Sequence, residues 1–67
     1  MPVITVRQVA GRSMAQKREL AKRITDVVHE VNGTAPEHIH VIIDEVPDGH
    51  WLHGYEVVAL PQPEPRS

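Results

Sequence analysis

The sequence predicts an α+β fold, in which a small β-α-β unit with parallel strands is followed by a short C-terminal hairpin. Residues 3–9 are rich in valine and alternate in polarity, which is typical of a strand. Apolar side chains then recur at helical spacing, and residues 39–46 form a second, more continuously apolar strand. Because such a crossover is right-handed and joins parallel strands in nearly every case, both strands are expected in one sheet.

The helix is expected to begin at Met14, since Ser13 and Gln16 have the spacing of a capping box that satisfies the first free backbone N–H groups. Asn32 and Gly33 supply a left-handed stop. Between these ends, the apolar side chains form one stripe and charged side chains fill the other faces, as a helix with one buried side requires. The stripe consists of Leu20, Ile24, Val27, Val28 and Val31.

Beyond the helix, Pro36 ends the connection to the second strand. Residues 47–49 have the composition of a turn. After the aromatic segment 50–55, residues 56–58 are expected to form a short strand or hairpin arm. We therefore expect one domain over residues 1–60, followed by an extended, proline-rich tail at 61–67.

The size of the chain predicts a homo-oligomer. A domain of 67 residues buries only about 60% of the surface that its unfolded chain exposes, and a chain without cysteine has no disulfides to compensate. One helix covers only one face of a two-stranded sheet, whereas parallel sheets are almost always buried on both faces. The open face is therefore expected to meet another copy of the chain.

Charge and hydropathy limit the possible partners. The net charge is −2 and there is no block of basic residues, which argues against a nucleic-acid partner. No apolar run approaches the roughly 20 residues of a membrane span, and the first residues do not resemble a signal peptide. We expect a soluble, cytoplasmic protein with no membrane partner.

Pro2 is a candidate catalytic residue. If Met1 is removed, the chain begins with a secondary amine, and unperturbed α-amino groups titrate near ~7.7 to 8.0, so a modest decrease in pKa leaves such an amine neutral. It could then act as a general base or a nucleophile. The alternative is that Pro2 is only a stiff start to an edge strand, where its missing N–H costs nothing.

The same topology separates Pro2 from Arg12. Pro2 precedes the first strand and should lie near Ile39 and His40 at the start of the second, whereas Arg12 follows the far end of the first strand. About seven strand residues at ~3.3 Å each place the two roughly 20 Å or more apart. If both serve one site, Arg12 must come from a neighbouring subunit.

In its order of motifs, the chain resembles the 4-oxalocrotonate tautomerase family. The resemblance covers residues 2 to about 54. It rests on Met1-Pro2, Gly11-Arg12-Ser13 followed by Gln16-Lys17, the amphipathic helix, Val41-Ile42-Ile43-Asp44-Glu45-Val46, and Gly49-His50-Trp51. It implies a tautomerase-like β-α-β subunit in a hexamer or related assembly, and an isomerase that shifts a proton in an enol or unsaturated 2-oxo acid.

The resemblance also implies roles for four residues. Pro2 matches the catalytic base, Arg12 the arginine that holds a substrate carboxylate, and Trp51 the aromatic residue that keeps the pocket dry. The chain departs from the family at His40, where a second arginine is typical. A histidine donates fewer hydrogen bonds and cannot make a two-pronged contact, so we expect a weaker donor and weaker binding of dicarboxylates.

The histidines also suggest a second, different hypothesis. Two pairs of histidines have spacings compatible with zinc or nickel ligation, namely His38 with His40 and His50 with His53. No carboxylate or thiolate stands at a matching spacing to complete such a site. We therefore predict no metal and no cofactor. The alternative to an enzyme of this kind is an oligomer of the same fold that is non-catalytic, or that binds a metal or small molecule, in which Pro2 is structural.

Overall fold

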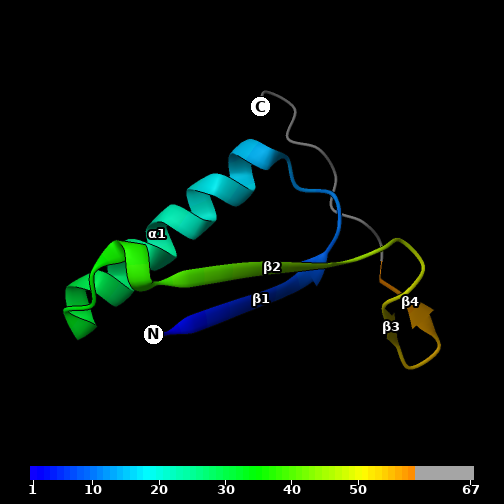
Figure 1. Cartoon of the computed structure of the whole chain (residues 1–67). Helices are drawn as coiled ribbons and strands as arrows, with labels where there is room; N and C mark the ends of the chain where they lie inside the picture. The colour runs from blue at the N-terminus through cyan, green and yellow to red at the C-terminus, as the bar shows by residue number, and fades with distance from the viewer. Residues whose placement is uncertain (59–67) are drawn as a thin grey trace.

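The computed structural model describes residues 1–58, and its elements follow the predicted order (Figure 1). The elements are β1 (Val3–Val9), α1 (Met14–Asn32), the 3-10 helix η1 (Pro36–His38), β2 (His40–Val46), β3 (Leu52–His53) and β4 (Glu56–Val57). The short helix η1 was not predicted from the sequence. The predicted tail at 61–67, and the domain boundary at residue 60, lie outside the described residues.

Strands β1 and β2 form a parallel pair, as predicted from the crossover. Their register runs from Val3 beside His40 to Val9 beside Val46. One hydrogen bond closes each end of the ladder: His40 N donates to Pro2 O at 3.0 Å, and Ala10 N donates to Val46 O at 2.9 Å. Pro2 is therefore held at the start of the sheet, beside His40.

Both ends of α1 are capped by the residues that the sequence predicts. The Ser13 hydroxyl accepts from Gln16 N at 3.1 Å, and the Gln16 side chain accepts from Ser13 N at 2.9 Å, which completes the capping box. At the other end, Gly33 adopts the left-handed conformation with a φ of 74°. Neither α1 nor η1 is long and apolar enough to span a membrane.

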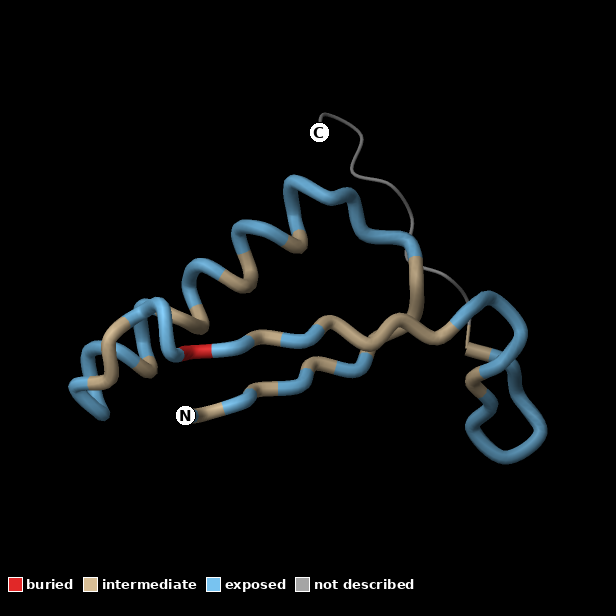
Figure 2. Tube along the Cα trace, viewed as in Figure 1, coloured by how far each residue is buried: buried red, intermediate tan, exposed pale blue. Residues whose placement is uncertain are grey.

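Helix α1 packs on one face of the sheet, and the enclosed core is very small. Among residues 1–58, only Ile39 is buried, with 8% of its surface exposed (Figure 2). The predicted apolar stripe of α1 is only partly covered, because Val27 and Val31 remain 58% and 76% exposed. The chain alone thus leaves unburied much of the apolar surface that its sequence provides.

The other face of the sheet carries side chains that nothing in residues 1–58 covers. Strand alternation places Val3 and Arg7 on this face of β1 and Ile42 and Asp44 on this face of β2. Val3 and Ile42 are 56% and 50% exposed, and Arg7 forms an ion pair with Asp44 at 2.8 Å. We call this surface, made by Val3, Arg7, Ile42 and Asp44, the open face.

The C-terminal hairpin lies beyond the carboxyl end of β2 (Figure 1). Strands β3 and β4 are antiparallel, with Leu52 opposite Val57 and His53 opposite Glu56. A further bond from Val58 N to Trp51 O, 2.8 Å long, extends the pairing by one position. The hairpin arm predicted at 56–58 is confirmed.

Loss of the capping hydroxyl should destabilise the protein. We expect Ser13→Ala to lower the free energy of unfolding by about 1 kcal/mol, because one N–H of the first helical turn loses its acceptor. Urea unfolding at a fixed protein concentration measures the change. Ser13→Asp keeps a side-chain acceptor and should stay close to wild type; equal losses in both variants would show that the cap does not cause the effect.

Candidate active site

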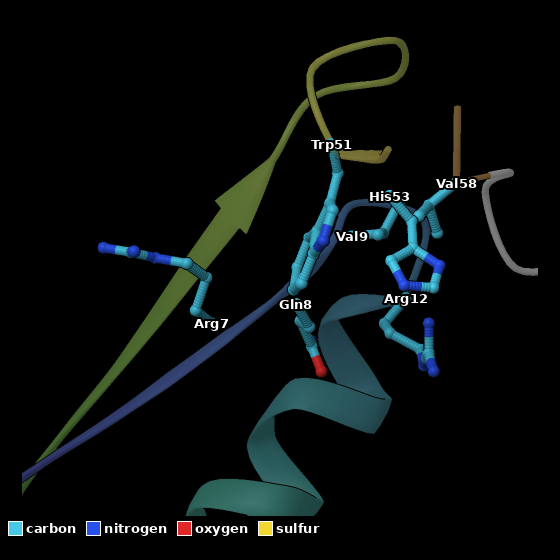
Figure 3. A pocket seen from close by; sticks show the side chains of 7 residues that line it. All are labelled: Arg7, Gln8, Val9, Arg12, Trp51, His53 and Val58. Carbon is cyan, nitrogen blue, oxygen red and sulfur yellow. The ribbon is translucent and has the colours of Figure 1, made fainter. Parts of the chain in front are cut away.

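A cavity of about 500 Å³ lies where β1, the loop before α1 and the hairpin meet (Figure 3). It stands at the carboxyl end of both long strands, next to the residues that leave β1 and enter the hairpin. Its lining residues are Arg7, Gln8, Val9, Arg12, Trp51, His53 and Val58. We call this cavity the Arg12–Trp51 pocket.

The hairpin supplies one wall of the pocket through strand alternation. Trp51 and His53 are two residues apart, so their side chains share a face of the hairpin. Because Val58 pairs with Trp51, it lies on the same face. Glu56, directly opposite His53, also belongs to this face but does not line the pocket. The wall is thus an indole and a valine beside an imidazole.

Arg12 supplies a cation that nothing else in residues 1–58 neutralises. It leaves the chain between β1 and α1, is exposed, and forms no ion pair with another described residue. A cation this close to a helix N-terminus interacts unfavourably with the helix dipole. A guanidinium presents a planar set of donors that fits a carboxylate, so the pocket can hold an organic anion.

Polar side chains lie where the helix-facing side of the sheet meets the pocket. Lys17 Nζ is 2.7 Å from Glu45 Oε1, and both side chains are mostly covered, with 22% and 25% exposed. Gln8 is the register partner of Glu45 and lines the Arg12–Trp51 pocket. Gln8 Nε2 and Glu45 Oε2 are buried without a hydrogen-bond partner. The Gln8 side chain points from β1 toward α1 (Figure 3).

The four predicted site residues fall into two groups at opposite ends of the sheet. Pro2 and His40 adjoin at the start of the strands, whereas Arg12 and Trp51 line the pocket at the other end. The seven residues of β1 separate the groups by about 23 Å, at the usual rise per strand residue. The separation between Pro2 and Arg12 inferred from the sequence is therefore present within one chain.

Sequence reasoning missed several lining residues. Gln8 and Val9 are close to Arg12 in the sequence, whereas Val58 is the cross-strand neighbour of Trp51 and is identified by the hairpin register. His53 was considered only as a metal ligand, although its spacing from Trp51 already placed both on one face of a short strand. Within residues 1–58, no group of three or more His, Cys, Asp or Glu side chains could hold a metal ion.

Comparison with known proteins identifies the relatives of this chain. The family model described as tautomerase enzyme matches residues 2–60. A probable tautomerase of Halalkalibacterium halodurans is 43% identical over 51 residues, which are 76% of this chain and 84% of that protein. A solved 4-oxalocrotonate tautomerase homologue superposes with a TM-score of 0.80 at 33% identity, covering 85% of this chain and 90% of that one.

A heterohexamer 4-oxalocrotonate tautomerase from Chloroflexus aurantiacus is also similar, with a TM-score of 0.76 and 30% identity over 85% of this chain and 92% of that chain. Fold and pocket thus define a small β-α-β enzyme of the isomerase class. The chain belongs to the 4-oxalocrotonate tautomerase family, as its sequence motifs indicated, and the protein is a tautomerase.

The position of Trp51 in the pocket wall should depend on the backbone conformation of Gly54. Gly54 begins the two-residue loop between β3 and β4 with a φ of 67°, where an L side chain costs about 1 to 2 kcal/mol. We expect Gly54→Ala to loosen the hairpin and to increase acrylamide quenching of Trp51, the only tryptophan of the chain.

Tyr55→Ala is the matched control, since Tyr55 is fully exposed and its φ is not positive. It should leave the quenching unchanged. If Gly54→Ala also left it unchanged, the loop conformation would not be what holds Trp51 in the pocket wall.

Proposed function

We propose that the protein shifts a proton within an enol or unsaturated 2-oxo acid, with the Pro2 amine as general base and Arg12 as the carboxylate-binding group. The observation that carries the proposal is the Arg12–Trp51 pocket, in which a guanidinium without an ion-pair partner in residues 1–58 stands beside an indole wall in a member of the tautomerase family. The substrate is a small carboxylate, and the chain's own residues supply the base and the anion-binding group.

The mechanism requires removal of Met1, because in the chain with Met1 the nitrogen of Pro2 is an amide without basicity. Once free, the secondary amine takes a proton from the enol oxygen, or from the carbon next to a carbonyl, and returns it to another atom of the conjugated system. Nearby cations and an apolar wall favour the neutral amine, since both disfavour its charged form. Arg12 binds and orients the carboxylate, and Trp51 limits access of water.

The active site is composed of residues from different subunits of a homo-oligomer, as in a hexamer. Pro2 and Arg12 lie at opposite ends of β1, so Pro2 of one copy works with Arg12 of another. The open face and the exposed Val27 and Val31 provide apolar surface for such contacts. A hexameric relative is the heterohexamer from Chloroflexus aurantiacus described above.

His40 acts as a weaker hydrogen-bond donor beside Pro2. Its backbone N–H is already bonded to Pro2 O, and its exposed imidazole stays free to contact a substrate oxygen. An imidazole offers one donor when neutral and two when protonated, whereas a guanidinium offers five. The site therefore favours substrates with one carboxylate, and Trp51 limits the room around it.

Replacement of Pro2 should remove most of the activity. We expect Pro2→Ala to lower kcat/KM for ketonisation of 2-hydroxymuconate or phenylenolpyruvate by about 100-fold, the usual contribution of a positioned general base. Stopped-flow absorbance measures the rate, and mass spectrometry of each protein reports whether Met1 is absent. Equal rates in the two proteins, both lacking Met1, would remove Pro2 from the mechanism.

Mixed assemblies should test whether a site uses two chains. Pro2→Ala and Arg12→Ala are each expected to be nearly inactive. Unfolding and refolding them together should restore part of the activity, because some sites then combine an intact Pro2 with an intact Arg12. Each variant refolded alone is the control, and failure of the mixture to exceed them, despite mixed oligomers by native mass spectrometry, would contradict the shared site.

A further inference from the structure

His53 lines the Arg12–Trp51 pocket but has no role in the fold or in the proposed mechanism. It extends from β3 on the same face as Trp51, and in the view of the pocket its imidazole stands to the right of the indole and above the Arg12 side chain (Figure 3). Among the three hairpin residues that line the pocket, Trp51, His53 and Val58, only His53 can change its charge.

The ring nitrogens of His53 are free to bind a ligand. Within residues 1–58 no side chain or carbonyl hydrogen-bonds to them, in contrast to His29, whose Nδ1 lies 2.8 Å from Thr34 O. His53 is exposed toward the cavity, so its polar atoms are not satisfied by burial against protein. Because Arg12 lines the same cavity, one small anion can lie within reach of both side chains.

We propose that His53 is a specificity-determining residue that donates a second hydrogen bond to the anion held by Arg12. The inference rests on the proposed function in one respect, namely that the Arg12–Trp51 pocket receives the substrate carboxylate. The guanidinium binds two oxygens in a plane, and the imidazole N–H fixes the anion from the side of the hairpin. Recognition by two groups from separate segments selects both charge and orientation.

The charges around His53 determine how this contact varies with pH. Arg12 faces it from the loop before α1 and is charged throughout, while Glu56 faces it across the hairpin. Arg7 lines the pocket, but its side chain points away toward Asp44 on the open face (Figure 3). An imidazole that gains a proton adds a second cation next to Arg12, so an anion should bind more tightly at lower pH.

The test is a titration of Trp51 fluorescence with benzoate, a monocarboxylate that cannot enolise, at about pH 5.5 and about pH 8. The proteins are wild type, Pro2→Ala, His53→Ala, His53→Asn and the matched control His50→Ala. His50 lies in the turn just before Trp51, is exposed and does not line the pocket. Circular dichroism and size-exclusion chromatography check that each variant is folded and assembled.

We expect His53→Ala to raise the Kd about tenfold at the lower pH, the factor that one hydrogen bond to an anion corresponds to. His53→Asn, which keeps a donor without a titratable ring, should lose less affinity and show a weaker pH dependence than wild type. His50→Ala should stay within about twofold of wild type, since it changes no pocket contact. Unchanged affinity in both His53 variants, or equal losses in His50→Ala, would overturn the proposal.

The two proposals fail in different ways. If wild type catalyses ketonisation but binds benzoate equally well with and without His53, the role of His53 is wrong and the proposed function stands. If binding depends on His53 while neither wild type nor Pro2→Ala ketonises an enol acid, the anion site stands without the proposed reaction. If wild type binds no benzoate at millimolar concentration, the inference about His53 is overturned.

Discussion

A single helix on one face of a two-stranded sheet is the constraint on which the rest of this structure depends. Only Ile39 is buried among the described residues, and no residue of α1 is. Small domains need disulfides, metals or partners when their own core is this limited, and a chain without cysteine cannot use the first. The association with other copies that we propose would therefore serve stability as well as catalysis.

The parallel crossover determines which candidate site residues an assembly of several copies could bring together. It holds Pro2 beside His40 at one end of the sheet and fixes Arg12 and Trp51 at the other. Within one chain the candidate base and the candidate anion site cannot meet. In an assembly that brings opposite strand ends together, the contacts that cover exposed apolar surface would also complete the proposed site, so folding, association and activity would depend on the same interfaces.

The sequence was sufficient for the elements with strong periodicity and specific end signals. β1 and α1 have the predicted bounds, because the alternating pattern of β1 stops at Val9, shortly before Gly11, and a capping box marks the start of α1. The helix η1 was missed because three residues are too few for a periodic signal. The pocket was harder to predict from the sequence. Trp51 and Arg12 were found through their resemblance to family residues. The role proposed for His53 depends on a two-residue strand whose pairing only the structure reveals.

Two imidazoles distinguish the chemistry of this chain. At His40, where the resemblance to the family implies an arginine, the chain lacks a second guanidinium beside Pro2, so Arg12 of another copy would be the permanent cation that favours the neutral amine. At His53 an imidazole lines the same pocket as Arg12.

In the proposed assembly both rings approach one substrate from different chains, so the charge that the site presents to an anion is no longer constant. A pocket with Arg12 as its fixed cation and histidines as variable ones would bind carboxylates most tightly in mildly acidic solution, where the Pro2 amine is least available as a base. Affinity and proton abstraction would then have opposite dependences on pH, and the greatest kcat/KM would lie between them.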